Sequence, residues 1–293
     1  MKKNILVIGK TGMLGSQVFS YLSQNPEFEV YGTTRDSNDW SENTIYFNAD
    51  CNFIQEEKIS KLITQSTGKD YKDYKYDYVI NCIGVIKPYS EKNKAQTIFL
   101  NSLFPAMLSK ACDKEGIKML HISTDCVFDG DPHDSCMSSP DNKYDENSPI
   151  SAQDLYGQSK ALGENNSGMT LRTSIIGEEL DHKVSLLEWL KSQKGKEVNG
   201  FMTHYWQGLT TKQLSKSIEK IINLDLYNQG IHNIHSPFHV TKRELVRLID
   251  AKFNLCLKVK ETYPLPCDRT LSSVKYLCGN LNIPKIEDQI KDL

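Results

Sequence analysis

The sequence has no cysteine pair with the C-x-x-C spacing, and its cysteines lie scattered over 293 residues. This scatter excludes the common zinc-binding spacings. The N-terminus also has no secretion signal, so we expect reduced thiols, mostly small core residues, in a cytoplasmic protein. The eight cysteines are Cys51, Cys82, Cys112, Cys126, Cys136, Cys256, Cys267 and Cys278.

Basic residues are not in excess, since 35 Lys and Arg face 37 Asp and Glu, for a formal net charge of −2. This balance gives no reason to expect a nucleic-acid partner. The first apolar run, Ile5 to Ile8, stops at Gly9 and is too short for a signal peptide or a membrane span. We therefore expect no membrane attachment. The sequence contains no internal repeat and no long low-complexity linker.

Short apolar segments alternate with helical patterns over the first 174 residues. Strands are expected at 4–9, 28–34, 44–47, 76–84, 117–123 and 169–174, and helices at 12–25, 53–63, 95–116 and 152–166. Several of these strands are apolar on both faces, which is typical of a parallel sheet covered by helices on both sides. The sequence therefore predicts an α/β fold with a doubly wound parallel sheet.

The alternation changes after about Ser174, which marks a second part of the chain. A helix is expected at 211–224, a strand at 230–236, and a helix at 241–253 whose Thr241 and Glu244 fit a capping box. We predict a first domain at 1–175 and a smaller α/β lobe, mainly for substrate binding, at 176–293. Whether later segments return to the first domain is left open.

The stretch "GKTGMLG" places three glycines between the first strand and the first helix. Glycines in this position permit a tight turn and close approach of a ligand to the backbone, and the helix N-terminus attracts a pyrophosphate. The alternative is a purely structural turn. We predict a dinucleotide-binding loop that contains Gly9, Thr11, Gly12, Met13, Leu14 and Gly15.

The end of the second strand bears on the choice of cofactor. The stretch "VYGTTRD" places Thr34 and Arg35 where an acidic residue would bind the ribose of NAD. A guanidinium suits the 2′-phosphate of NADP(H), which is therefore preferred, while the neighbouring Asp36 keeps NAD(H) open. The alternative is that Arg35 is a solvated surface charge.

Tyr156 and Lys160 lie four residues apart on a predicted helix and hence on one face of it. A tyrosine needs a nearby cation for acid–base work near neutral pH, because its ordinary pKa is about 10. Tyr71 and Lys75 have the same spacing, but they lie in a polar loop where no helix holds them together. We therefore predict that Tyr156 and Lys160 are catalytic and that Lys160 also holds a nicotinamide ribose.

The segments "STDCVFDG", "YGQSKALGE" and "LRTSIIG" follow the glycine loop in this order. Together they resemble the extended short-chain dehydrogenases/reductases, in particular the dTDP-4-dehydrorhamnose reductase branch. This resemblance implies a Rossmann-like sheet and a catalytic set of Thr124, Tyr156 and Lys160, in which Thr124 hydrogen-bonds the reacting oxygen. Capping of the strand end is the alternative role for Thr124. The implied activity is NADPH-dependent reduction of a nucleotide-activated 4-keto-6-deoxysugar in deoxysugar or surface polysaccharide biosynthesis.

The resemblance also implies ligand contacts elsewhere in the chain. Trp206 is equally well explained as a core residue. The family has tyrosine where this chain has Cys126, which alters the sugar pocket, so the resemblance does not fix rhamnose as the product. The implied cofactor contacts are Asp50, Cys51, Asn81, Ile83 and Gly84, and the implied substrate contacts are Asp125, Cys126, Phe128, Trp206 and Gln207.

Two other functions are compatible with this resemblance. The first is a nucleotide-sugar epimerase or 4,6-dehydratase that retains its cofactor. Dehydratases carry an Asp-Glu pair after the threonine, and here Cys126 follows Asp125, which disfavours that reaction. The second is a dinucleotide-binding regulatory subunit, as in methionine adenosyltransferase. A nucleotide-sugar is the expected partner, and homodimerisation is left open.

Overall fold

The computed structural model describes residues 2–39, 41–50, 52, 56–64, 75–131, 143–164, 167–181 and 183–293. The chain forms two compact units that interleave along the sequence. The first unit consists of 1–123, 154–171 and 222–231, and the second of 124–153, 172–221 and 232–293. The sequence prediction had placed residues 124–153 in the first domain, whereas they group with the second unit.

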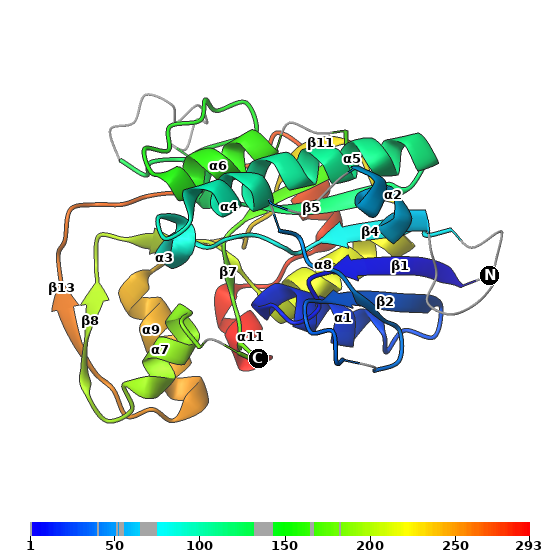
Figure 1. Ribbon diagram of the computed structural model, residues 1–293. Helices are drawn as coiled ribbons and strands as arrows, with labels where there is room; N and C mark the ends of the chain where they lie inside the picture. Colours follow the sequence, from blue (N-terminus) through cyan, green and yellow to red (C-terminus); the bar gives the residue numbers. More distant parts are fainter. Residues whose placement is uncertain are drawn as a thin grey trace. The chain divides into compact units, whose positions relative to one another are not determined.

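A seven-stranded parallel sheet with the strand order β11-β6-β5-β4-β1-β2-β3 forms the centre of the α/β fold (Figure 1). Residues 5–8 of the central strand β1 are completely buried, as expected when helices cover both faces of a sheet. The strands are β1 (Lys3–Ile8), β2 (Phe28–Thr34), β3 (Thr44–Tyr46), β4 (Tyr78–Asn81), β5 (Lys118–Thr124), β6 (Met169–Thr173) and β11 (Gly230–Asn233).

The helices of the first unit arise from the predicted apolar spacing. In α1, Leu14, Val18 and Leu22 recur every four residues and are buried, because this spacing forms one stripe along a helix. The helix expected at 95–116 forms, but in its middle the backbone hydrogen bonds change from the α-helical to the π-helical pattern, and this segment is η1. The helices are α1 (Met13–Leu22), α2 (Glu56–Thr64), α3 (Lys87–Ser90), α4 (Lys94–Ile98), η1 (Phe99–Leu103), α5 (Phe104–Glu115) and α6 (Leu155–Gly163).

Helix α6 packs closely against η1, and glycine makes this approach possible. A Cβ atom on Gly163 would lie 2.0 Å from the carbonyl oxygen of Asn101. At this contact Ser102 Oγ donates a hydrogen bond of 2.7 Å to the carbonyl of Ser159, and Asn101 Nδ2 donates one of 3.0 Å to Ser159 Oγ. The π-helix and the glycine therefore fix the position of α6, which carries Tyr156 and Lys160.

The second unit contains three small two-stranded sheets and its own apolar core. That core includes Leu187, Leu190, Trp206, Leu245 and Ile249. The sheets pair β7 (Ile175–Ile176) with β10 (Leu209–Thr210), β9 (Tyr205–Trp206) with β12 (Val240–Thr241), and β8 (Glu197–Phe201) with β13 (Lys258–Thr262). The other elements are η2 (Asp125–Val127), α7 (Leu186–Ser192), α8 (Thr211–Asn223), whose last two residues group with the first unit, α9 (Lys242–Phe253), α10 (Leu277–Leu281) and α11 (Ile286–Lys291).

Two expectations for the second half of the chain can be compared with the structure. The capping box of α9 is confirmed, because Thr241 Oγ1 accepts a hydrogen bond from the Glu244 N–H while Glu244 accepts one from the Thr241 N–H. The strand expected in the smaller lobe at 230–236 instead forms β11, an edge strand of the large sheet. A later segment thus returns to the large sheet, which the sequence analysis had left open.

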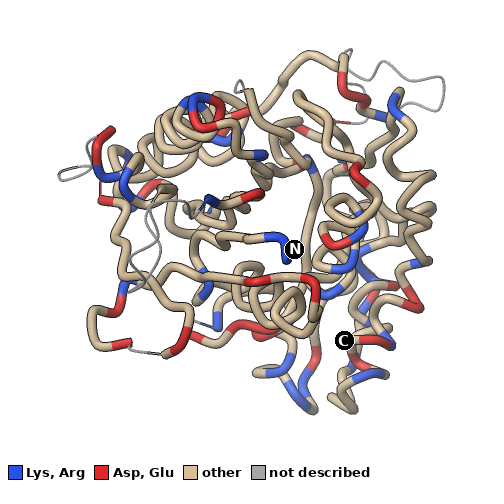
Figure 2. Tube along the Cα trace, turned by 90° about the vertical axis from the view of Figure 1, so that its right-hand side faces the viewer, with Lys and Arg blue, Asp and Glu red and all other residues tan. Residues whose placement is uncertain are grey.

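Charged residues of both signs are interspersed along the described trace (Figure 2). Among the described residues, no helix has the length and apolar character needed to cross a membrane.

The contact between α6 and η1 predicts the effect of two matched glycine substitutions. Gly163→Ala should lower the free energy of unfolding by about 1–3 kcal/mol, because its methyl group overlaps the Asn101 carbonyl. Gly279→Ala in α10 should be neutral or stabilising, since nothing lies within 4 Å of its Cβ position. Urea unfolding of both variants measures the difference. Equal stability of the two variants would contradict the close packing of α6.

Candidate functional site

The glycine loop follows β1 and turns directly into α1. Gly9 has a φ of 89°, a conformation that favours glycine, and its N–H donates a hydrogen bond of 2.8 Å to Thr33 Oγ1. A Cβ on Gly15 would lie 2.0 Å from the Gly9 carbonyl oxygen, so the turn requires glycine there. A Cβ on Gly12 would meet only that oxygen, at 3.6 Å, so backbone is exposed where α1 begins with unsatisfied N–H groups. The loop therefore fits a bound pyrophosphate.

The end of β2 contributes an exposed cation. Arg35 is exposed and makes no ion pair among the described residues. Lys10 in the glycine loop is already paired, because its Nζ lies 3.0 Å from Asp39. Hydrogen bonds from Ser41 and then Lys10 lower the pKa of Asp39 to about 2. Arg35 is therefore available for a ligand phosphate, whereas Lys10 is not, and the sequence analysis missed this pair.

The cofactor contacts implied for Asp50 and Cys51 are only partly described. Asp50 is partly buried, and its carboxylate accepts a hydrogen bond of 2.8 Å from the Asn52 N–H. Cys51 lies outside the described residues.

The end of β4 brings the next predicted residues close to Lys160. Asn81 is fully buried, where its Oδ1 accepts a hydrogen bond from the Ile83 N–H and its Nδ2 lies 3.1 Å from His121 Nδ1. A Cβ built on Gly84 would lie 3.2 Å from Asn101 Oδ1 and 3.7 Å from Lys160 Nζ. A side chain at residue 84 would therefore crowd the Asn101 amide beside Lys160, and the cofactor contact predicted for Gly84 stays a prediction.

Tyr156 and Lys160 lie on α6, which begins at Asp154, whose carboxylate accepts a hydrogen bond from the Gly157 N–H. Tyr156 is partly exposed, whereas Lys160 is only 5% exposed and its Nζ donates a hydrogen bond of 2.6 Å to the carbonyl of Ile122 in β5. Burial lowers the pKa of Lys160 to about 8, although Glu164 and then Cys82 act in the opposite direction. The sequence spacing thus places a partly exposed tyrosine and a buried amine on one helix face.

A second contact between α6 and β5 was missed by the sequence analysis. Ser123 Oγ donates a hydrogen bond of 2.5 Å to Glu164 Oε1, and Glu164 is only 3% exposed. The signal was present in "SKALGE", because a carboxylate four residues after Lys160 lies on the same helix face.

Thr124, the last residue of β5, caps the 3₁₀-helix η2. Its Oγ1 accepts a hydrogen bond of 3.1 Å from the Cys126 N–H and donates one of 3.2 Å to Asp125 Oδ1. This is the strand-end capping considered above as the alternative role. A hydroxyl can accept one hydrogen bond and donate another, so Thr124 can keep the cap and turn its proton to a ligand oxygen.

Three predicted substrate contacts have internal roles in the second unit. The ring of Phe128 is fully buried and stacks on Tyr144, with 4.1 Å between the centroids. Trp206 belongs to the core, and its Nε1 donates a hydrogen bond to Ser174 Oγ. Gln207 is also buried, and its amide bonds to the backbone of Ser236 and Leu271. Because these groups are enclosed or already paired, the structure offers no support for direct substrate contact by them, whereas Asp125 and Cys126 are partly exposed.

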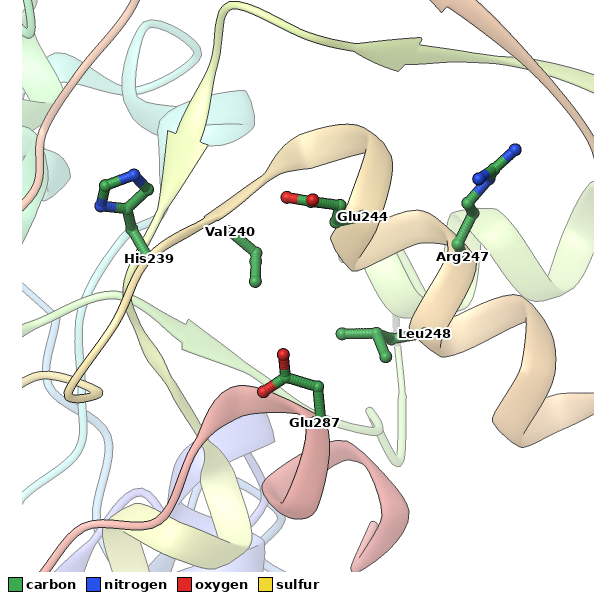
Figure 3. Close-up of a pocket in the computed structure, with 6 residues that line it drawn as sticks. All are labelled: His239, Val240, Glu244, Arg247, Leu248 and Glu287. Atoms are coloured by element: carbon green, nitrogen blue, oxygen red, sulfur yellow. The ribbon is translucent and has the colours of Figure 1, made fainter.

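The second unit also has an open surface groove of about 370 Å³ (Figure 3). Glu244, Arg247 and Leu248 reach it from α9, and Glu287 reaches it from α11. The Glu244 carboxylate already caps α9 through Thr241. None of the predicted site residues lines this groove, so we assign no function to it.

Comparison with protein families gives a match to the family described as RmlD substrate binding domain, over residues 1–207. The curated dTDP-4-dehydrorhamnose reductase of Mycobacterium tuberculosis is 37% identical over 89 residues, which cover 30% of this chain and 28% of that protein. The probable low-salt glycan biosynthesis reductase Agl14 of Haloferax volcanii is 29% identical over 177 residues, or 58% of this chain and 52% of that protein. The matched region thus spans at most about half the length of these relatives.

A similar solved structure is that of dTDP-4-dehydrorhamnose reductase from Bacillus anthracis in complex with NADP. It is 20% identical, with a TM-score of 0.74 and coverage of 100% of this chain and 98% of that chain. This similarity confirms the predicted Rossmann-like α/β fold.

The buried amine predicts a pH-dependent difference in stability. Lys160 has a folded-state pKa of about 8, against an ordinary value of 10.5. Between these pH values the unfolded chain binds more protons at Lys160 than the folded chain does, so the unfolding free energy rises with pH. Relative to Lys160→Met, the unfolding free energy of the wild type should rise by about 3 kcal/mol over the whole interval. Chemical unfolding of both proteins from pH 7 to 10 measures this. If the unfolding free energies of the wild type and Lys160→Met change with pH in parallel, Lys160 is not desolvated in the folded protein.

Proposed function

We propose that this chain, which belongs to the family described as RmlD substrate binding domain, is an NADPH-dependent reductase. Its substrate is a nucleotide-activated 4-keto-6-deoxysugar, and its role is in deoxysugar or surface polysaccharide biosynthesis. The observation that carries this proposal is the position of Lys160. Its buried amine bonds to the carbonyl of Ile122, two residues before Thr124 at the carboxyl end of β5. Ligands of open α/β sheets bind at this edge.

The residues at the glycine loop fit a dinucleotide and favour NADP(H) over NAD(H). Gly12 leaves room for a pyrophosphate where α1 begins, and Arg35 offers an exposed guanidinium to the 2′-phosphate. NADP is also bound in the related structure from Bacillus anthracis. When bound, NADPH supplies the hydride for the carbonyl carbon.

The chain's own residues handle the proton and the charge on the carbonyl oxygen. Tyr156 donates its phenolic proton to that oxygen as a general acid. Lys160 in its ammonium form favours the phenolate that Tyr156 becomes, and it also holds the nicotinamide ribose. The Thr124 hydroxyl turns from Asp125 to donate a hydrogen bond to the reacting oxygen, which stabilises the developing negative charge.

The residue that follows Asp125 supports a reductase over a dehydratase. The charge of Asp125 acts on the nearby Lys242, where it opposes the lowering of that lysine's pKa by burial. Cys126 follows where a dehydratase needs a second carboxylate.

Removal of the proton donor tests the chemical step. Tyr156→Phe should lower kcat by about 10²–10⁴-fold while NADPH affinity changes little, because phenylalanine keeps the ring and loses only the hydroxyl. Consumption of NADPH with a panel of nucleotide-4-keto-6-deoxysugars, with product NMR, measures turnover. Tyr71→Phe is the control, since its Tyr-x-x-x-Lys match is attributed to chance. Full activity of Tyr156→Phe would refute the assigned acid.

Removal of the exposed guanidinium tests the cofactor preference. Arg35→Ala should weaken NADPH binding by about 10–100-fold and leave NADH binding nearly unchanged, because only NADPH carries the 2′-phosphate. Calorimetric titration with each cofactor measures the ratio. Arg247→Ala, another exposed arginine, is the control and should bind both cofactors as the wild type does. Equal losses for NADPH and NADH would rule out a phosphate contact.

A further inference from the structure

Glu164 is a buried carboxylate to which the proposed mechanism gives no role. It follows α6 directly, one helical turn after Lys160, and is only 3% exposed. Ser123 in β5 donates a hydrogen bond of 2.5 Å to its Oε1. Carboxylates are rarely buried to this extent unless another charge or a set of donors compensates them.

The groups around Lys160 come from three elements of the first unit. Helix α6 carries Tyr156 one turn before Lys160, and Glu164 is the residue that caps its C-terminal end. The residue after β4 is Cys82, whose thiol stays protonated because burial raises its pKa to about 12. Strand β5 contributes the Ile122 carbonyl and His121, and burial, followed by the charge of Lys160, holds the pKa of His121 well below its ordinary range.

Among the described groups around the buried amine, this arrangement leaves Glu164 as the negative charge that acts on it. His121 and Cys82 are neutral near pH 7, and the Ile122 carbonyl satisfies one of the three ammonium donors. Burial alone favours the uncharged amine, and an opposite charge nearby favours the ammonium. Glu164 therefore opposes the deprotonation of Lys160. The proposed mechanism uses the ammonium form of Lys160 to hold the cofactor and to assist Tyr156.

We propose that Glu164 is a positioning residue that keeps Lys160 in its ammonium form through its charge, independently of the hydrogen bond from Ser123. The proposal rests on the proposed function in one respect only, namely that Lys160 acts there as an ammonium group. A purely structural role for Glu164, as an anchor of α6 on β5, is the competing explanation.

Two substitutions separate charge from anchoring. Glu164→Gln removes the charge but keeps an oxygen that can accept the hydrogen bond from Ser123. Ser123→Ala removes the hydrogen bond but keeps the carboxylate. Glu164→Asp keeps the charge on a shorter side chain. Glu57→Gln is the matched surface control, because Glu57 pairs with Lys61 at the same four-residue spacing on α2 but is exposed.

The direct measurement is an NMR titration of the Lys160 side-chain nitrogen in protein with ¹⁵N-labelled lysine. Lys160→Met identifies the signal, and neither substrate nor cofactor is needed. In Glu164→Gln the titration midpoint should fall by about one pH unit from the wild type, whereas Ser123→Ala, Glu164→Asp and Glu57→Gln should stay close to it. An unchanged midpoint in folded Glu164→Gln, or an equal fall in Ser123→Ala, would overturn the proposal.

The second measurement is the pH dependence of kcat/KM, with a keto sugar that the protein reduces as the substrate. The protonated fraction of Lys160 declines as pH rises through its pKa, so in Glu164→Gln the alkaline loss of kcat/KM should begin about one pH unit lower. If no keto sugar is reduced while the NMR midpoint shifts, the proposed function fails and the role of Glu164 stands. If keto sugars are reduced, but Glu164→Gln leaves both the titration midpoint of Lys160 and the alkaline loss of kcat/KM unchanged, the role of Glu164 is refuted and the proposed function stands.

Discussion

The buried ammonium of Lys160 is the constraint on which the arrangement of the first unit depends. A cation taken out of water costs several kcal/mol unless hydrogen bonds and opposite charge compensate it. The compensation comes from the Ile122 carbonyl in β5 and from Glu164 after α6. Both groups must therefore stay fixed relative to the helix, which explains why polar contacts between α6 and β5 are short and enclosed.

Close backbone approach is the second requirement, and glycine meets it at three places. Gly163 lets α6 reach the Asn101 carbonyl in η1, and Gly15 lets α1 pass over the Gly9 carbonyl. Gly84 lets the chain after β4 pass close to the Asn101 side chain and to Lys160. A π-turn such as η1 is often found at functional sites, and here it directs the Asn101 side chain to the backbone of Val85 and to Ser159.

The strands, the helices and the position of Tyr156 and Lys160 on one helix could be predicted because apolar periodicity and the four-residue spacing are local signals. The strand β2, for example, has the predicted bounds Phe28–Thr34. The enclosure of Phe128 and Gln207 could not be predicted, since it depends on Tyr144 and Leu271, which are distant in sequence. The return of β11 to the large sheet and the Ser123–Glu164 contact are likewise long-range pairings.

The most direct test of the account follows the hydrogen that is added to the sugar. The protein is incubated with a nucleotide-4-keto-6-deoxysugar and NADPH that carries deuterium at the transferable position of its nicotinamide C4, and the product is examined by NMR. The account predicts deuterium at C4 of the sugar and one NADPH oxidised for each sugar reduced. A rearranged sugar without deuterium and without net oxidation of NADPH would contradict it.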